Sequence, residues 1–209
     1  MRTADHRRLG QYLLREIEEY KNLPLLHKIS FIWGNIEPDI NYVTYLKGFS
    51  ENKKFQGHNS QNGMTHIKKL TEKIEGKPLN VITCYRAGKI THYIADAFTF
   101  PHNDGFTGNI KNHMSYERRL HCKFSQYLDK ASFPFRVKIQ EPDPWVVFAC
   151  MHARYILWRK TQTDDIEYML QAAGQVLISI AQRSVQRKGV YGPFMVQQNN
   201  CPISEKISF

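Results

Sequence analysis

The sequence predicts an all-α protein, a multi-helix bundle formed by a single domain over residues 1–209. No segment shows the sustained alternation of apolar and polar residues that is typical of a β-strand. A chain of 209 residues is long enough to bury a core of its own. Several segments repeat apolar residues at helical spacing, most clearly in the last predicted helix, at Ile166, Met169, Leu170, Ala173, Leu177, Ile180 and Ala181.

The chain carries 29 Lys and Arg against 19 Asp and Glu, a net charge of +10. Such a surplus indicates an anionic partner, which would be a phosphate ester, an anionic membrane surface or nucleic acid. The basic residues are scattered along the chain, so solubility explains the charge almost equally well.

Neither the cysteines nor the N-terminus indicates export. The four cysteines form no CxxC pair and are expected to be reduced thiols. The N-terminus has no apolar stretch of the kind found in signal peptides, and no run of about 18 apolar residues could span a membrane. We therefore expect a cytoplasmic protein without a transmembrane segment.

The first half of the chain predicts helices over residues 4–20 and from Leu25 to Gly34. His6 lies on the first turn of the former and, considered alone, is simplest as a solvent-exposed side chain. Pro38 is expected to end the second helix and to leave Asp39 in a loop, where an Asx turn is the local expectation.

A long loop, residues 48–63, follows and carries His58 in the corner Gly-His-Asn. The next predicted helix, residues 63–75, is polar, so His66 on it is expected to be exposed.

The second half predicts helices over residues 79–99 and 113–129, then a connector over 130–142. Asp143 and Pro144 form a typical helix start. The helix that follows is strongly apolar, and His152 within it is expected to be a hydrogen-bonded core histidine. Asp164 is expected to cap the last helix.

The stretch between residues 92 and 117 concentrates residue types that bind first-row metals. Its pattern is HxxxD, a histidine six residues later, and then HxxxE. Residues four apart share one face of a helix, so each pair can hold one ion from a rigid support. The ligand candidates are His92, Asp96, His102, His113 and Glu117.

The alternative is that these are surface residues that happen to fall at helical spacing, and either pair alone would be explained that way. Two pairs with an interposed histidine make that less plausible. The apolar neighbours Ile90, Ile94, Phe98, Leu120 and Phe124 place both faces against a core, where unpaired charge is costly. A bound metal removes this conflict.

The pattern resembles the bacterial zinc-dependent phospholipase C family, whose central motif is HxxxD, six residues to His, then HxxxE. The segment GNIEPDIN with Asp39, the GHN corner with His58, and ADHRRLG with His6 are similar to the family's other ligand segments. The resemblance covers roughly residues 4–130 and implies a helical bundle around a zinc cluster.

The resemblance also implies how two or three Zn²⁺ ions would be held. One ion would take Asp39, His58, His92 and Asp96, with His66 as the alternative to His58. A second would take His102, His113 and Glu117, and a third would take His6 with Asp96 as a bridge. In the family the third ion also binds the amine and carbonyl of an N-terminal Trp. This sequence starts with Met1, which Arg2 is expected to retain.

The implied activity is hydrolysis of a phosphodiester, in the first place a phospholipid, with Asp39 as the catalytic carboxylate that orients or deprotonates the attacking water. The basic surplus would favour peripheral contact with an anionic membrane. The alternatives are a zinc-dependent single-strand nuclease, which shares this metal cluster, and a non-catalytic helical protein that zinc stabilises.

Overall fold

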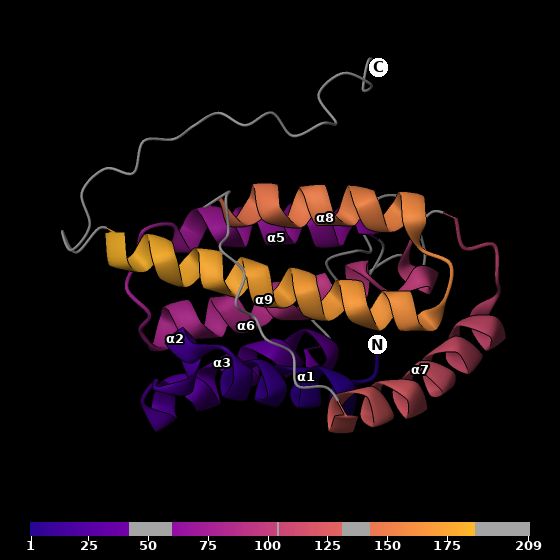
Figure 1. Cartoon of the computed structure of the whole chain (residues 1–209), viewed down its shortest axis with the longest axis horizontal. Coiled ribbons are helices and arrows are strands. Elements are labelled where there is room, and N and C mark those ends of the chain that lie inside the picture. The colour runs from indigo at the N-terminus through magenta and orange to yellow at the C-terminus, as the bar shows by residue number, and fades with distance from the viewer. Residues whose placement is uncertain (42–59, 104, 131–142, 187–209) are drawn as a thin grey trace, which may run out of the picture.

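The computed structural model describes residues 1–41, 60–103, 105–130 and 143–186, and these residues form helices and no strand (Figure 1). The predicted all-α class is therefore confirmed. The helices are α1 (Thr3–Glu16), α2 (Glu18–Lys21), α3 (Leu25–Ile40), α5 (Ser60–Ile74), α6 (Val81–Ala97), the 3₁₀ turn η2 (Phe100–His102), α7 (Ile110–Lys130), α8 (Pro144–Trp158) and α9 (Gln162–Gln186).

Helices α6 and α9 run through the middle of the bundle in Figure 1. On one side α3 packs against α6, and α1 packs against α3. On the other side α5 packs against α6, and α8 against α9. Helix α7 lies at one end of the molecule, where it contacts α1 and α9 (Figure 1).

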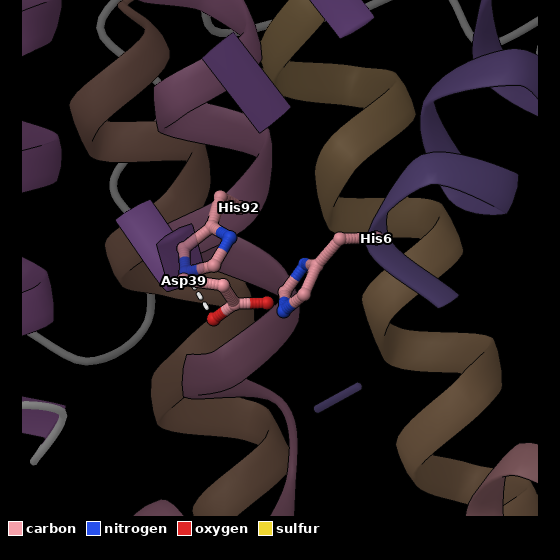
Figure 2. Close-up of side chains that lie close together, drawn as sticks. All are labelled: His6, Asp39 and His92. Carbon is pink, nitrogen blue, oxygen red and sulfur yellow. Dashed lines mark ion pairs between the residues drawn. The ribbon is translucent and has the colours of Figure 1, made fainter. Parts of the chain in front are cut away.

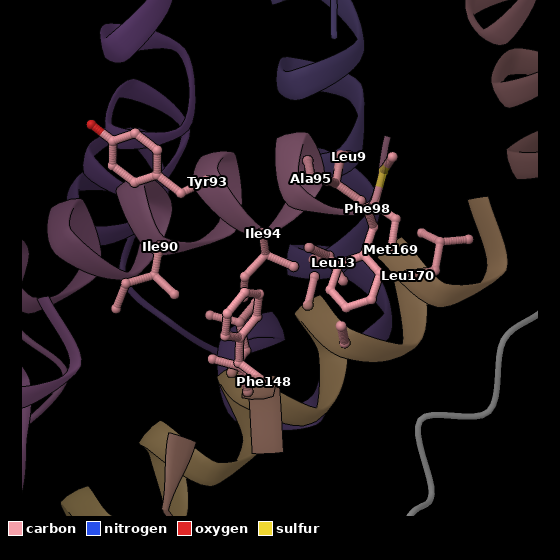
Figure 3. Packing of buried hydrophobic residues seen from close by; sticks show 14 of the residues in the cluster. Leu9, Leu13, Ile90, Tyr93, Ile94, Ala95, Phe98, Phe148, Met169 and Leu170 are labelled. Carbon is pink, nitrogen blue, oxygen red and sulfur yellow. The ribbon is translucent and has the colours of Figure 1, made fainter. Parts of the chain in front are cut away.

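The core forms around α6 because that helix is apolar on most of its circumference. Ile90, Ile94 and Phe98 are fully buried. They pack with side chains of α1, α8 and α9, among which Leu13, Phe148 and Met169 are visible in Figure 3. The apolar surroundings expected for His92 and Asp96 are therefore confirmed.

Local capping signals set several helix boundaries. Asn80 accepts a hydrogen bond from the backbone N–H of Thr83 at the start of α6. Asp143 accepts from two backbone N–H groups of α8, as predicted.

The prediction that Asp164 caps the last helix is wrong. Thr161 is the capping residue of α9, and its Oγ1 accepts from the N–H of Asp164 while the Asp164 carboxylate accepts from the N–H of Thr161.

The first predicted helix is divided at Ile17, whose backbone is extended between α1 and α2. Ile17 is fully buried. At Ile17 the chain therefore bends towards α3 while the Ile17 side chain stays buried in the core.

Helix α3 is longer than predicted. Neither Gly34 nor Pro38 ends it, and Asp39 lies on its last turn instead of in a loop. Proline inside a helix removes one hydrogen bond. Here Gly34 and Pro38 are both buried against the neighbouring helices. This tertiary packing outweighs the local preference of glycine and proline for ending a helix.

The packing of α3 on α6 is unusually close because glycine lies on both sides of the contact. A methyl group at Gly34 would overlap the carbonyl oxygen of Tyr85, and one at Gly88 would overlap the carbonyl oxygen of Phe31. This contact brings Asp39 of α3 next to His92 of α6. None of the described helices has the length and apolar content needed to span a membrane.

Gly88→Ala is expected to lower the free energy of unfolding by about 1–3 kcal/mol, because backbone atoms would have to move apart. Gly63→Ala in α5 is the matched control. A methyl group at Gly63 meets no atom, so this change is expected to stabilise the protein by about 0.5–1 kcal/mol. Urea unfolding measures both variants, and equal stability of the two would contradict the close contact.

Candidate metal centre

Three predicted ligands from three helices meet in the core of the bundle. His6 comes from α1, Asp39 from α3 and His92 from α6 (Figure 2). Their ligand atoms lie within 4.8 Å of one another. The rings of His6 and His92 stack with centroids 3.9 Å apart, and His92 Nε2 lies 3.8 Å from Asp39 Oδ1.

The protonated nitrogen of His92 can be assigned from its neighbours. His92 Nδ1 lies 3.0 Å from the backbone carbonyl oxygen of Asn35, which can only accept a hydrogen bond. Nδ1 therefore carries the proton, and the lone pair of neutral His92 is on Nε2, which faces the carboxylates of Asp39 and Asp96. A lone pair that faces two carboxylates is the arrangement expected of a metal ligand.

Sequence reasoning missed Asn35, although it lies four residues before Asp39 and therefore on the same helical face. Besides the contact of its carbonyl with His92, its side-chain amide donates to the backbone oxygen of His6 at 2.5 Å. Asn35 is fully buried. It thus fixes the positions of both histidines relative to α3.

Asp96 joins the first three ligands to the remaining ones. One carboxylate oxygen, Oδ1, lies 3.3 Å from His6 Nε2 and 3.6 Å from His102 Nδ1. The other, Oδ2, lies 3.4 Å from His92 Nε2. The carboxylate therefore lies among His6, His92 and His102; its role as a bridge between ions stays a prediction.

The second group consists of His102, His113 and Glu117, whose ligand atoms also lie within 4.8 Å of one another. His113 Nε2 is 3.1 Å from Glu117 Oε1, as expected for residues four apart on α7. His102 lies on η2, just beyond α6 as predicted. Its Nδ1 is 3.1 Å from the carbonyl oxygen of Asp96, so this nitrogen is also the protonated one.

The amine of Met1 lies between the two groups, 2.9 Å from Asp96 Oδ1 and 3.2 Å from Glu117 Oε1. The residue at this place is a Trp in the family that the sequence resembles. Burial alone lowers the pKa of this amine, but the two carboxylates outweigh it and raise the pKa to about 10. In the absence of another cation, the charged amine offsets part of the negative charge of the cluster.

The electrostatics of the cluster favour cation binding. Burial lowers the pKa of His6 and of His102 to about 4, so both imidazoles are neutral at pH 7. Burial by itself would raise the pKa of the two carboxyl groups, those of Asp96 and Glu117. The Met1 amine and the imidazoles outweigh this effect for Asp96 and hold its pKa well below the usual range. The hydrogen bond from His113, with the Met1 amine, lowers the pKa of Glu117 to about 2.

A buried Asp165 carboxylate holds the second group in place from outside. It accepts hydrogen bonds from the hydroxyls of Tyr116 and Tyr155 and pairs with Arg159 at 2.8 Å. Tyr116 directly precedes Glu117, and the Arg159 guanidinium lies 4.1 Å from the ring centre of Phe100 on η2. The carboxylate therefore connects α7, α8, α9 and the turn that carries His102.

The remaining histidine predictions have different outcomes. His58, an implied ligand, lies outside the described residues. His66 is exposed, as predicted, and stacks on Tyr93 at 4.9 Å. It belongs to neither ligand group found among the described residues. His121 lies 2.6 Å from Asp5 Oδ1, and His152 is a buried core histidine that lies 3.1 Å from Asn103 Oδ1, as predicted. His6, expected from its local sequence to be exposed, is fully buried.

The residues present fit a zinc ion. Neutral imidazoles and carboxylates are zinc ligands. Two buried atoms of the first group, His6 Nδ1 and Asp39 Oδ2, have no hydrogen-bond partner within the part of the chain that the structure describes. Buried polar atoms without partners are costly, and a bound cation would satisfy them.

Comparison with known proteins agrees with this geometry. The family model for zinc-dependent phospholipase C matches residues 5–171, well over half of the chain. Neither the curated proteins nor the solved structures gave a match. Because the matched region includes all seven ligand candidates that the structure describes in α1, α3, α6 and η2–α7, and reaches beyond them into α9, we conclude that the chain belongs to the zinc-dependent phospholipase C family.

Proposed function

We propose that the protein is a zinc-dependent phosphodiesterase of the phospholipase C type, which hydrolyses a glycerophospholipid to diacylglycerol and a phosphorylated headgroup. The observation that carries the proposal is the pair of ligand groups, His6–Asp39–His92 and His102–His113–Glu117, connected by the Asp96 carboxylate. The family membership supports a hydrolase that uses zinc.

Each ligand group would hold one ion, and Asp96 would bridge them. In the first group the stacking of His6 on His92 places His6 beside the first ion, where it would serve that ion when two are bound and a third ion when three are bound. His58 would complete this group, as the resemblance implies. A third ion, if bound, would take His6 and Asp96.

The bound zinc ions would supply an activated water near neutral pH and charge stabilisation for the phosphate oxygens. The protein's own contribution is to hold the reacting groups. We assign to Asp39 the role of orienting the attacking water and accepting its proton. The assignment is supported by its buried Oδ2, which has no hydrogen-bond partner among the described residues and is therefore able to accept a proton.

The first prediction concerns metal content. Protein purified without chelator is expected to contain one zinc ion for each of the two ligand groups, hence about two or more per chain. Elemental analysis by mass spectrometry measures the stoichiometry. A value well below one ion per chain, in protein that has not been exposed to a chelator, would refute the assignment of both groups as zinc sites.

The second prediction separates ligands from the other histidines. His92→Ala is expected to reduce both activity and thermal stability, because it removes the buried imidazole that faces the carboxylates of Asp39 and Asp96, at about 1–3 kcal/mol. His66→Ala and His27→Ala are the matched controls and are expected to retain zinc, activity and stability. A melt of His92→Ala that coincides with that of the parent protein would contradict the role of His92. Loss of zinc in His66→Ala would make His66, in place of His58, the ligand.

The third prediction concerns the substrate. With zinc added, the protein is expected to hydrolyse dispersed glycerophospholipids faster than single-stranded oligonucleotides. Asp39→Asn keeps the size of the side chain but removes its basicity, and it is expected to lower turnover by about 10²–10⁴-fold. Phosphate-ester products released from both substrates are measured side by side, with zinc content determined for each protein.

Two other outcomes have definite meanings. Oligonucleotide turnover that exceeds lipid turnover and disappears in Asp39→Asn would identify a nuclease. Absence of turnover for both substrates, with both zinc sites filled, would indicate a non-catalytic protein that zinc stabilises.

A further inference from the structure

Helix α3 exposes an apolar surface to solvent along its whole length. Five of its large apolar side chains are about half exposed or more, and we call them the α3 stripe: Leu25 (73%), Leu26 (62%), Ile29 (54%), Trp33 (50%) and Ile40 (48%). Scattered single apolar residues are normal at a protein surface. A contiguous set on one helical face is typical of an interaction site.

The stripe is a distinct face of the helix. At about 100° per residue its five members fall within one third of the helical circumference. The opposite face carries the buried residues Phe31, Gly34 and Pro38. The stripe itself contains no charged residue, and the two acidic residues of α3 lie elsewhere. Glu37 is buried and pairs with Lys89 at 2.8 Å, and Asp39 faces His92.

The surface extends in two directions. At one side the Ser30 hydroxyl donates to the backbone oxygen of Val81 at 2.6 Å, and this contact brings the exposed side chain of Ile82 (59%) beside α3. At the C-terminal end Ile40 directly follows Asp39. The C-terminal end of the stripe is therefore one residue away from a candidate metal ligand.

We propose that the α3 stripe is the surface by which the protein lies on a phospholipid bilayer. The proposal rests on the proposed function, since it makes the bilayer the source of the substrate. An uncharged apolar face with a Trp near its middle suits insertion into the boundary between headgroups and acyl chains.

Charge favours a bilayer as the occupant over other apolar partners. The net charge of +10 attracts anionic lipid headgroups, and Lys21 and Lys28 lie near the N-terminal end of the stripe. Neither acidic residue of α3 is turned towards the stripe. With α3 on the bilayer, Asp39 would be separated from the lipid headgroups by no more than the diameter of one helix.

The test is flotation of the full chain, loaded with zinc, with vesicles of equimolar phosphatidylcholine and phosphatidylserine. Ile29→Ser combined with Trp33→Ser is expected to weaken vesicle binding by about 10-fold or more, since two apolar side chains no longer enter the lipid. Leu25→Ser combined with Leu26→Ser is a second, independent variant for which the same result is expected.

The matched control is Ile156→Ser combined with Leu157→Ser on α8, on the opposite side of the bundle in Figure 1. These side chains are 54% and 72% exposed, similar to those of the stripe, and their loss is expected to leave binding unchanged. Hydrolysis of a water-soluble short-chain phosphatidylcholine below its micellar concentration is expected to be the same for all variants, because that substrate needs no surface.

The outcomes separate this inference from the proposed function. Vesicle binding that depends on the stripe, in a protein without lipid turnover, would support the inference and refute the function. Unchanged vesicle binding in both stripe variants would overturn the inference, whatever the turnover. It would also be overturned if sedimentation showed a dimer that the stripe variants convert to monomer, because the surface would then be occupied by a second copy of the chain.

Discussion

The buried carboxylate of Asp96 is the group on which the polar interior depends. A carboxylate in an apolar core is stable as an anion only if cations or donors surround it. The charged Met1 amine supplies the cation, 2.9 Å from Oδ1, and the imidazoles of His6, His92 and His102 lie within about 4 Å of the carboxylate. These groups come from the N-terminus, α1, α6 and η2. The same requirement makes the site a strong attractor for metal cations, since neutral imidazoles and ionised carboxylates already face one another.

The helical framework makes this arrangement possible through one close contact. Gly34 and Gly88 let α3 and α6 approach so far that Asp39 and Asn35 of one helix reach His92 of the other. Asn35 then fixes which nitrogen of His92 is protonated, and it holds His6 through its backbone oxygen. On another face the same helix presents apolar side chains to solvent. One element thus combines the carboxylate proposed to be catalytic, the orientation of two candidate ligands and the surface proposed for the bilayer.

Much of the structure depends on short-range rules and was predictable. The HxxxD and HxxxE pairs had to lie on single helical faces because the helix repeats every 3.6 residues. The apolar neighbours of His92 and the start of α8 at Asp143 were predictable for the same local reasons, and family membership followed from the motif spacing. The extent of the domain over residues 1–209 stays a prediction, as do the catalytic role of Asp39 and the identity of His58 as a ligand, which lies outside the described residues.

The sequence by itself determined the helical class, the two candidate ligand pairs and the burial of the first, His92 and Asp96, because each follows from side chains within a few residues of one another. The tertiary structure alone decided that α3 continues through Pro38, that Asp39 lies on a helix, that His6 is buried against His92, and that Asn35 orients both histidines. It also decided which apolar face of α3 is left in solvent. The physical reason is the same for all of these features. They depend on packing between segments far apart in the chain, and the free energy of that packing exceeds the local preference of any single residue.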